Sequence, residues 1–329
     1  MAQLGSSSPA QPLSVGDVVS ASIRLYRSHF KSYLGIAAMA VLWVLIPLVT
    51  LIPIVFLMVG AIDGEQSFNP LIPLLLAAWL VFLLYGLAQY LANSALISRL
   101  VFGELAEQPE SVATARRYTQ TRRWNFLWLS VLLGFLLTAV FLGFYLLIIL
   151  LFLLSAIVIG GGAAFGVPTA GINNPILFAL LGLLAVVLFF VMVGVLCWIS
   201  ARLAVSEVPL AVEDGVRAAA SIRRSWKLSQ KNALRILLVL LVAFLITLPL
   251  QAIVQIGVLA IQTVLGAQLE QTSPLYTSLS VLLGYILSFA VSIVIIPFWQ
   301  AIKAVIYYDL RSRREGLGLA LRDRTQGDY

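Results

Sequence analysis

The hydrophobic positions of this chain gather into six long runs, separated by short polar segments. The runs cover residues 34–59, 71–100, 126–159, 176–205, 234–265 and 279–306. A helix needs about 20 consecutive apolar residues to cross the bilayer core, and every run meets that length. The pattern predicts an all-α integral membrane protein with six transmembrane helices, forming a single polytopic membrane domain over residues 1–329.

The third run is longer than a bilayer requires. As one helix, residues 126–159 would extend about 51 Å at about 1.5 Å per residue. Splitting the run into two spans would reverse the orientation of everything that follows, so a kink or a protruding helix is the better prediction. Pro47, Pro53 and Pro249 are the expected kink sites within their own helices.

The polar segments are of two kinds, which differ in their basic residues. Three carry no Lys or Arg, namely residues 63–69, 160–175 and 268–274. The connectors at 103–124 and 207–232 are strongly basic, as are the N-terminal segment 1–33 and the tail 311–329 that flank the membrane region 34–310. Because Lys and Arg collect on the cytoplasmic side of membrane proteins, both termini and both basic connectors are predicted to be cytoplasmic.

The composition agrees with lipid as the main solvent of the chain. Hydrophobic residues make up 61% and charged residues 11%, whereas soluble domains contain about 25% charged residues. The net charge of +7 is carried by segments next to the apolar runs. Anionic lipid headgroups are therefore the expected partners, and nucleic acid is not.

A short basic–aromatic motif precedes each odd-numbered run. Its three copies are Arg24, Tyr26 and Lys31, then Arg116, Tyr118 and Arg123, then Arg224, Trp226 and Lys231. Each even-numbered run ends on a basic and then an acidic residue. The spacing predicts a threefold repeat whose unit is an interfacial helix, two membrane spans and a charged exit.

The first interfacial helix has two distinct faces at helical spacing. Ser14 and Asp17 predict a capping box at its start. The predicted apolar face consists of Val15, Val19, Ile23, Tyr26, Phe30 and Leu34, and the predicted polar face of Asp17, Ser20, Arg24, Arg27 and Lys31. Such a helix lies in the headgroup plane, where it either recognises anionic lipid or an acidic partner, or only fixes the topology. The candidate lipid or partner surface comprises Arg24, Arg27, Lys31, Arg116, Arg117, Arg122, Arg123, Arg224, Lys227 and Lys231.

Residues suited to catalysis are missing from the middle of the runs. The one histidine, His29, has basic neighbours, and no nucleophile–base or metal-ligand set can be assembled around it. We therefore expect no enzyme activity, no metal and no cofactor. The weaker polar positions either line a substrate path or form hydrogen bonds between helices, and they are Gln89, Asn93, Gln251, Gln255 and Gln262.

Three segments resemble a known family of bacterial membrane proteins. RLYRSHF at 24–30, SIRRSWKLSQKNALRI at 221–236 and AVIYYDLRSRREG at 304–316 are similar to the membrane domain of the glycerophosphoryl diester phosphodiesterase family. The resemblance implies a multi-pass protein of the bacterial cytoplasmic membrane. It transfers no activity, because the family's chemistry resides in a separate soluble domain.

Two functional hypotheses follow from the sequence. The first is a non-enzymatic membrane protein that organises or binds lipids, or another membrane protein, at the cytoplasmic face. The alternative is a transporter or lipid translocator, for which the repeat and the intramembrane polar positions are the motivation.

Overall fold

The computed structural model describes residues 14–62, 71–156, 175–270 and 273–315, and the regular elements within these residues are all helices. Six helices are long and apolar enough to cross a membrane, which confirms the predicted fold class. They are α2 (Phe30–Ile62), α3 (Leu71–Leu105), α5 (Arg123–Ala156), α6 (Pro175–Leu203), α9 (Ala233–Gln268) and α10 (Pro274–Glu315). The shorter helices are α1 (Val15–Ser28), α4 (Val112–Thr121), α7 (Glu207–Val212) and α8 (Ala218–Leu228).

Some predicted segments fall wholly or partly outside the described residues. These are residues 63–69, the end of the third run at 157–159, most of 160–175, and residues 271–272 of the connector 268–274. The parts of the N-terminal segment and the tail at 1–13 and 316–329 also lie outside. α10 continues as helix to Glu315, past residue 311, where the tail was predicted to begin. Arg311 and Glu315 form an ion pair one turn apart in this last part of the helix, with Arg311 Nε 3.1 Å from Glu315 Oε2.

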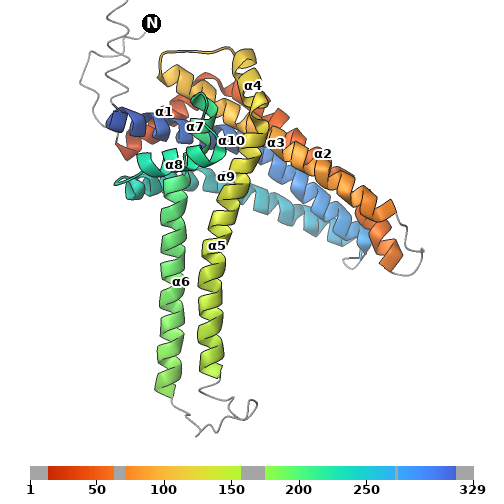
Figure 1. Ribbon diagram of the computed structural model, residues 1–329. Helices are drawn as coiled ribbons and strands as arrows, with labels where there is room; N and C mark the ends of the chain where they lie inside the picture. Colours follow the sequence, from red (N-terminus) through yellow and green to blue (C-terminus); the bar gives the residue numbers. More distant parts are fainter. Residues whose placement is uncertain (1–13, 63–70, 157–174, 271–272, 316–329) are drawn as a thin grey trace, which may run out of the picture.

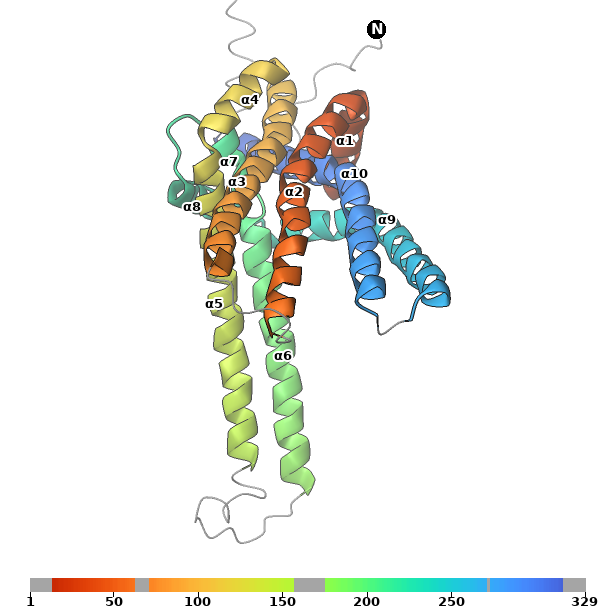
Figure 2. The ribbon, with the colours of Figure 1, turned by 90° about the vertical axis from the view of Figure 1, so that its right-hand side faces the viewer.

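The long helices form three antiparallel pairs that diverge from one end of the molecule (Figures 1 and 2). The pairs α2–α3 and α9–α10 pack against each other through α3, α2 and α10. The pair α5–α6 extends away from them, and it meets α3 and α9 at the end where the short helices gather (Figure 1). We call this end the head: α1, α4, α7 and α8, with the adjoining ends of the long helices.

The long third run forms a single helix in the described structure. α5 is continuous over Arg123–Ala156, so the run does not split into two spans. Pro47, Pro53 and Pro249 lie inside α2 and α9 as expected, and Pro297 lies inside α10, which was not predicted.

Close contact between α2 and α3 depends on one glycine. A Cβ atom added to Gly86 would lie only 2.3 Å from the carbonyl oxygen of Trp43. Nearby, Trp79 Nε1 donates a 2.8 Å hydrogen bond to the carbonyl oxygen of Pro47. The absence of a side chain at Gly86 therefore lets the two helix backbones approach, as small residues commonly do within membranes.

The predicted apolar face of α1 packs on the protein, together with residues that were not predicted. Val18, Val19, Ser22 and Leu25 are the buried residues of α1, and Val15, Ile23 and Tyr26 of the predicted face are partly buried against the same core. Phe30 belongs to α2 and is 41% exposed. This side of α1 contacts α10 and α9. The predicted capping box between Ser14 and Asp17 is present.

Candidate functional site

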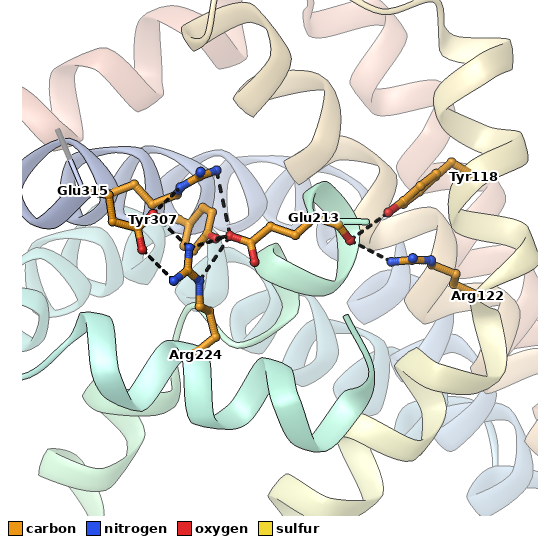
Figure 3. A network of polar contacts seen from close by, with 7 residues as sticks. Tyr118, Arg122, Glu213, Arg224, Tyr307 and Glu315 are labelled. Atoms are coloured by element: carbon orange, nitrogen blue, oxygen red, sulfur yellow. Dashed lines mark hydrogen bonds and ion pairs between the residues drawn. The ribbon is translucent and has the colours of Figure 1, made fainter. Parts of the chain in front are cut away.

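The head is held together by a network of polar contacts centred on Glu213, at the end of α7 (Figure 3). Arg224 of α8 donates to Glu213 Oε1 from Nε at 3.2 Å and from Nη2 at 3.0 Å. Arg224 also forms an ion pair of 2.6 Å with Glu315 of α10. The hydroxyl of Tyr307, also on α10, donates to Glu213 Oε1. One carboxylate therefore joins α7, α8 and α10.

The backbone of Glu213 extends the same network to α4 (Figure 3). Its carbonyl oxygen accepts 2.9 Å hydrogen bonds from the Tyr118 hydroxyl and from Arg122 Nη1. Burial raises the pKa of Tyr118, so its hydroxyl keeps the proton that it donates. These contacts are internal to the head, so they serve its packing and leave Arg122 less available to an outside ligand.

An arginine near the end of α3, and another near the end of α6, stacks on the aromatic residue of the motif copy that follows it in the chain. The Arg99 guanidinium of α3 lies 3.8 Å from the ring centre of Tyr118 on α4. In the same manner, Arg202 of α6 lies 3.6 Å from the ring of Trp226 on α8 and donates to its carbonyl oxygen at 2.8 Å. These are cation–π contacts at close range. The first holds α4 against α3, and the second holds α8 against α6.

The short helix α1, which carries the first copy of the basic–aromatic motif, is attached to the long helix α10. α1 packs on α10, and the Tyr26 hydroxyl donates a 3.1 Å hydrogen bond to the carbonyl oxygen of Val294. The aromatic residue of each motif copy thus has a role in holding its helix. The threefold repeat itself stays a prediction, and this shared use of Tyr26, Tyr118 and Trp226 is what supports it.

A second polar cluster lies where α3, α7 and α10 meet. Lys303 Nζ is 3.1 Å from Glu207 Oε2, and Gln300 Nε2 donates to the same oxygen at 3.2 Å. Gln300 also bonds to Ser94 and Ser98 of α3, at 2.6 Å each. Each polar group of this cluster that we name has a partner within the protein, so the cluster joins helices and presents no free group to a substrate.

The ten basic residues of the candidate surface divide into two groups. Arg116, Arg122, Arg123 and Arg224 are partly buried, with Arg123 lying 5.1 Å from the ring centre of Tyr85. The remaining six are exposed and form no ion pair with any residue that the structure describes, and they are Arg24, Arg27, Lys31, Arg117, Lys227 and Lys231. The exposed group keeps its charge available for an outside partner.

Sequence reasoning missed other residues of the head. Glu213, Tyr307 and Arg311 were not singled out, and no local pattern indicates that their side chains converge. Arg223 was also missed, and it is exposed on α8 beside the predicted Lys227. It lies in the same basic segment, four residues before Lys227, so helical spacing could have indicated it.

The intramembrane polar residues are not brought together. On α3, Gln89 bonds to the Tyr85 hydroxyl at 2.9 Å, and Asn93 Nδ2 donates to the carbonyl oxygen of Gln89 at 2.8 Å. Both side chains are buried. Gln251, Gln255 and Gln262 are instead exposed on α9. No hydrogen bond among the described residues links the two sets.

His29 lies at the junction of α1 and α2, where its Nδ1 atom is 3.3 Å from Glu104 Oε2. Within the part of the chain that the structure describes, no group of three or more His, Cys, Asp or Glu side chains is arranged to hold a metal ion.

Comparisons of the chain with protein-family models, with curated proteins and with solved structures find no match. The resemblance of the three basic segments to the phosphodiesterase-associated membrane domain therefore stays a prediction.

Proposed function

We propose that this protein is a non-enzymatic membrane protein whose head binds anionic lipid headgroups at the cytoplasmic face. The observation that carries the proposal is the exposure of three cations where α1 meets α2, namely Arg24 and Arg27 of α1 and Lys31 of α2, which we call the exposed row. None of the three forms an ion pair with a described residue.

The distribution of acidic residues explains why these cations stay free. Glu213, Glu315 and Asp309 are engaged by arginines inside the head, including Arg235 at 2.8 Å from Asp309. The chain has 21 basic and 14 acidic residues, so internal pairing leaves a cationic excess. Each exposed Lys or Arg near an anionic membrane surface contributes about 1 kcal/mol to binding.

The same exposed charges predict the orientation of the protein in the membrane. The six exposed cations belong to segments at the head, and Lys and Arg remain on the cytoplasmic side when a membrane protein inserts. The proposal therefore places the head and both termini in the cytoplasm, at the cytoplasmic membrane of a bacterium.

The test is lipid retention measured by native mass spectrometry. Wild-type protein in mild detergent is mixed with equal amounts of phosphatidylglycerol and phosphatidylcholine, and the bound lipids are counted. The variant R24Q/R27Q/K31Q is expected to lose its preference for phosphatidylglycerol, because the exposed row is then neutral. The matched control R24K/R27K/K31R keeps the charge and is expected to keep the preference. Equal retention by the wild type and the neutral variant would overturn the proposal.

A groove between α2 and α10 favours lipid translocation as a second candidate function. Its volume is about 500 Å³, and its lining is apolar except for Thr277, Ser278 and Tyr285. Grooves of about 300–1,000 Å³ accommodate small molecules, and an apolar groove between two membrane helices suits an acyl chain.

Lipid translocation is tested by lipid flux in proteoliposomes. Wild-type protein is expected to accelerate the transfer of a fluorescent phospholipid between leaflets. V281W, which fills the groove, is expected to slow the transfer, and V131W on the lipid-facing side of α5 serves as the control. A wild-type rate equal to that of protein-free vesicles would exclude this function.

A further inference from the structure

A hollow of about 360 Å³ opens on the head beside α4. Its lining comes from α3, from α4, and from the segments that precede α4 and follow α7, and every lining residue is charged or carries a hydroxyl group. α4 lies outside the membrane-spanning helices and on the opposite side of the head from the far ends of the three antiparallel pairs (Figures 1 and 2). A charged ligand can therefore reach the hollow without crossing hydrocarbon, and the volume suits a small molecule.

Arg99 and Glu110 form a fixed part of this lining. Arg99 Nε is 2.7 Å from Glu110 Oε2, and Arg99 Nη2 is 3.2 Å from Glu110 Oε1. Arg99 Nη1 also donates a 2.8 Å hydrogen bond to the carbonyl oxygen of Ala211, and the guanidinium stacks on the Tyr118 ring. The two charges of this pair neutralise each other, so Arg99 and Glu110 give the hollow its shape and add no net charge to it.

Two further charges line the hollow and have no counter-ion among the described residues. Arg117 of α4 is exposed, and it forms no hydrogen bond or ion pair with a residue that the structure describes. Asp214, which follows α7, is exposed and contacts the neutral Tyr118 hydroxyl. It forms no ion pair with a described residue. One free cation and one free carboxylate thus line the same hollow without pairing with each other.

We infer that the hollow binds a small zwitterion that carries a phosphate and a primary ammonium group. Arg117 and the Thr114 hydroxyl lie one turn apart on α4, and a phosphate has enough acceptor oxygens to bind both. Asp214 accepts hydrogen bonds from the ammonium. A ligand with only one of these groups would leave Arg117 or Asp214 without a counter-ion. Soluble phosphoethanolamine and the headgroup of phosphatidylethanolamine share this chemistry, and neither depends on the exposed row.

Calorimetric titration of the full chain in phosphatidylglycerol nanodiscs tests the inference, because this lipid has no ammonium group. Wild-type protein is expected to bind phosphoethanolamine more tightly than inorganic phosphate or ethanolamine, each of which carries one of the two groups. R117Q and D214N are each expected to weaken phosphoethanolamine binding about tenfold, since each removes a charge-assisted hydrogen bond. No binding of phosphoethanolamine by the wild type, or equal affinities for the three probes, would overturn the inference.

Two matched variants control for the loss of charge as such. R223Q and E107Q each remove an exposed charge that does not line the hollow, and both should bind phosphoethanolamine as the wild type does. All four variants are expected to keep the wild-type melting temperature, because none of the four residues forms an ion pair with a described residue. A loss of binding in the controls equal to that in R117Q and D214N would overturn the assignment of the hollow.

The source of the ligand is identified by repeating the titration in nanodiscs that contain phosphatidylethanolamine. A lipid headgroup that occupies the hollow competes with phosphoethanolamine and lowers its apparent affinity in wild-type protein. An unchanged affinity assigns the hollow to a soluble ligand. Both results support the same chemistry at Arg117 and Asp214, and they separate a membrane lipid from a molecule of the surrounding water.

Discussion

The Arg224 guanidinium lies 3.0 Å from Oε1 of Glu213 and holds α8 against the end of α7. Burial alone would lower the pKa of Arg224, but its hydrogen bonds to Glu213 and Glu315 outweigh that effect and raise it. Arg224 is therefore permanently charged and committed to the head. It differs in this respect from the adjacent Arg223, which is exposed and has no ion pair among the described residues.

Neutralising Arg224 is expected to destabilise the head. R224Q should lower the free energy of unfolding by about 1.5–3 kcal/mol, the range for hydrogen bonds to charged groups. Thermal unfolding in mild detergent measures the change. The neighbouring R223Q removes the same charge without breaking a contact, so its effect should stay within about 0.5 kcal/mol. Equal melting temperatures for the two variants would contradict a structural role of Arg224.

Glu207 and Lys303 are expected to be coupled energetically. E207Q and K303Q should each be destabilising, because each leaves a partly buried charge without its 3.1 Å partner. The double variant should cost less than the sum of the two, with a coupling energy of about 0.5–3 kcal/mol. A double-mutant cycle of unfolding free energies gives this value, and strict additivity would argue against the pair.

A methyl group at Gly86 is expected to force α2 and α3 apart. Its Cβ would meet the Trp43 carbonyl oxygen at 2.3 Å, so G86A should cost about 1–3 kcal/mol, as overpacking typically does. Gly134 on α5 provides the control, because a Cβ atom added there would have no described atom of a neighbouring segment within 4 Å. G134A should unfold at or slightly above the wild-type temperature, because alanine favours a helix over glycine. A similar loss in both variants would contradict the close contact at Gly86 as its cause.

The start of α1 is expected to weaken in acid. Hydrogen bonds with the Ser14 side chain and backbone lower the pKa of Asp17. A lowered pKa in the folded state means that the stabilisation is present above about pH 4, the ordinary value, and is lost as the pH falls through the folded pKa. Hydrogen exchange of the α1 amides should show more protection in wild type than in D17N at pH 6. The difference should disappear below the folded pKa, and a difference that persists there would contradict the role of the carboxylate.

The six spans could be predicted from the sequence because crossing a bilayer is a local requirement. Each helix needs its own continuous apolar stretch, so the positions of α2, α3, α5, α6, α9 and α10 follow from the order of residues. The start of α1 was predictable for a similar reason, since Ser14 and Asp17 interact within a single turn. The motif copies also located the short helices α1, α4 and α8.

The sequence could not show which charges are paired within the protein. Arg224 meets Glu213 across 11 residues and Glu315 across 91, and only the packing of α7, α8 and α10 brings these three together. For the same reason the sequence could place Gln251, Gln255 and Gln262 on one face of α9 but could not tell what that face contacts. Helical spacing determines which residues share a face. The tertiary structure alone decides whether that face meets protein or lipid, because contacts distant in sequence depend on how the helices pack.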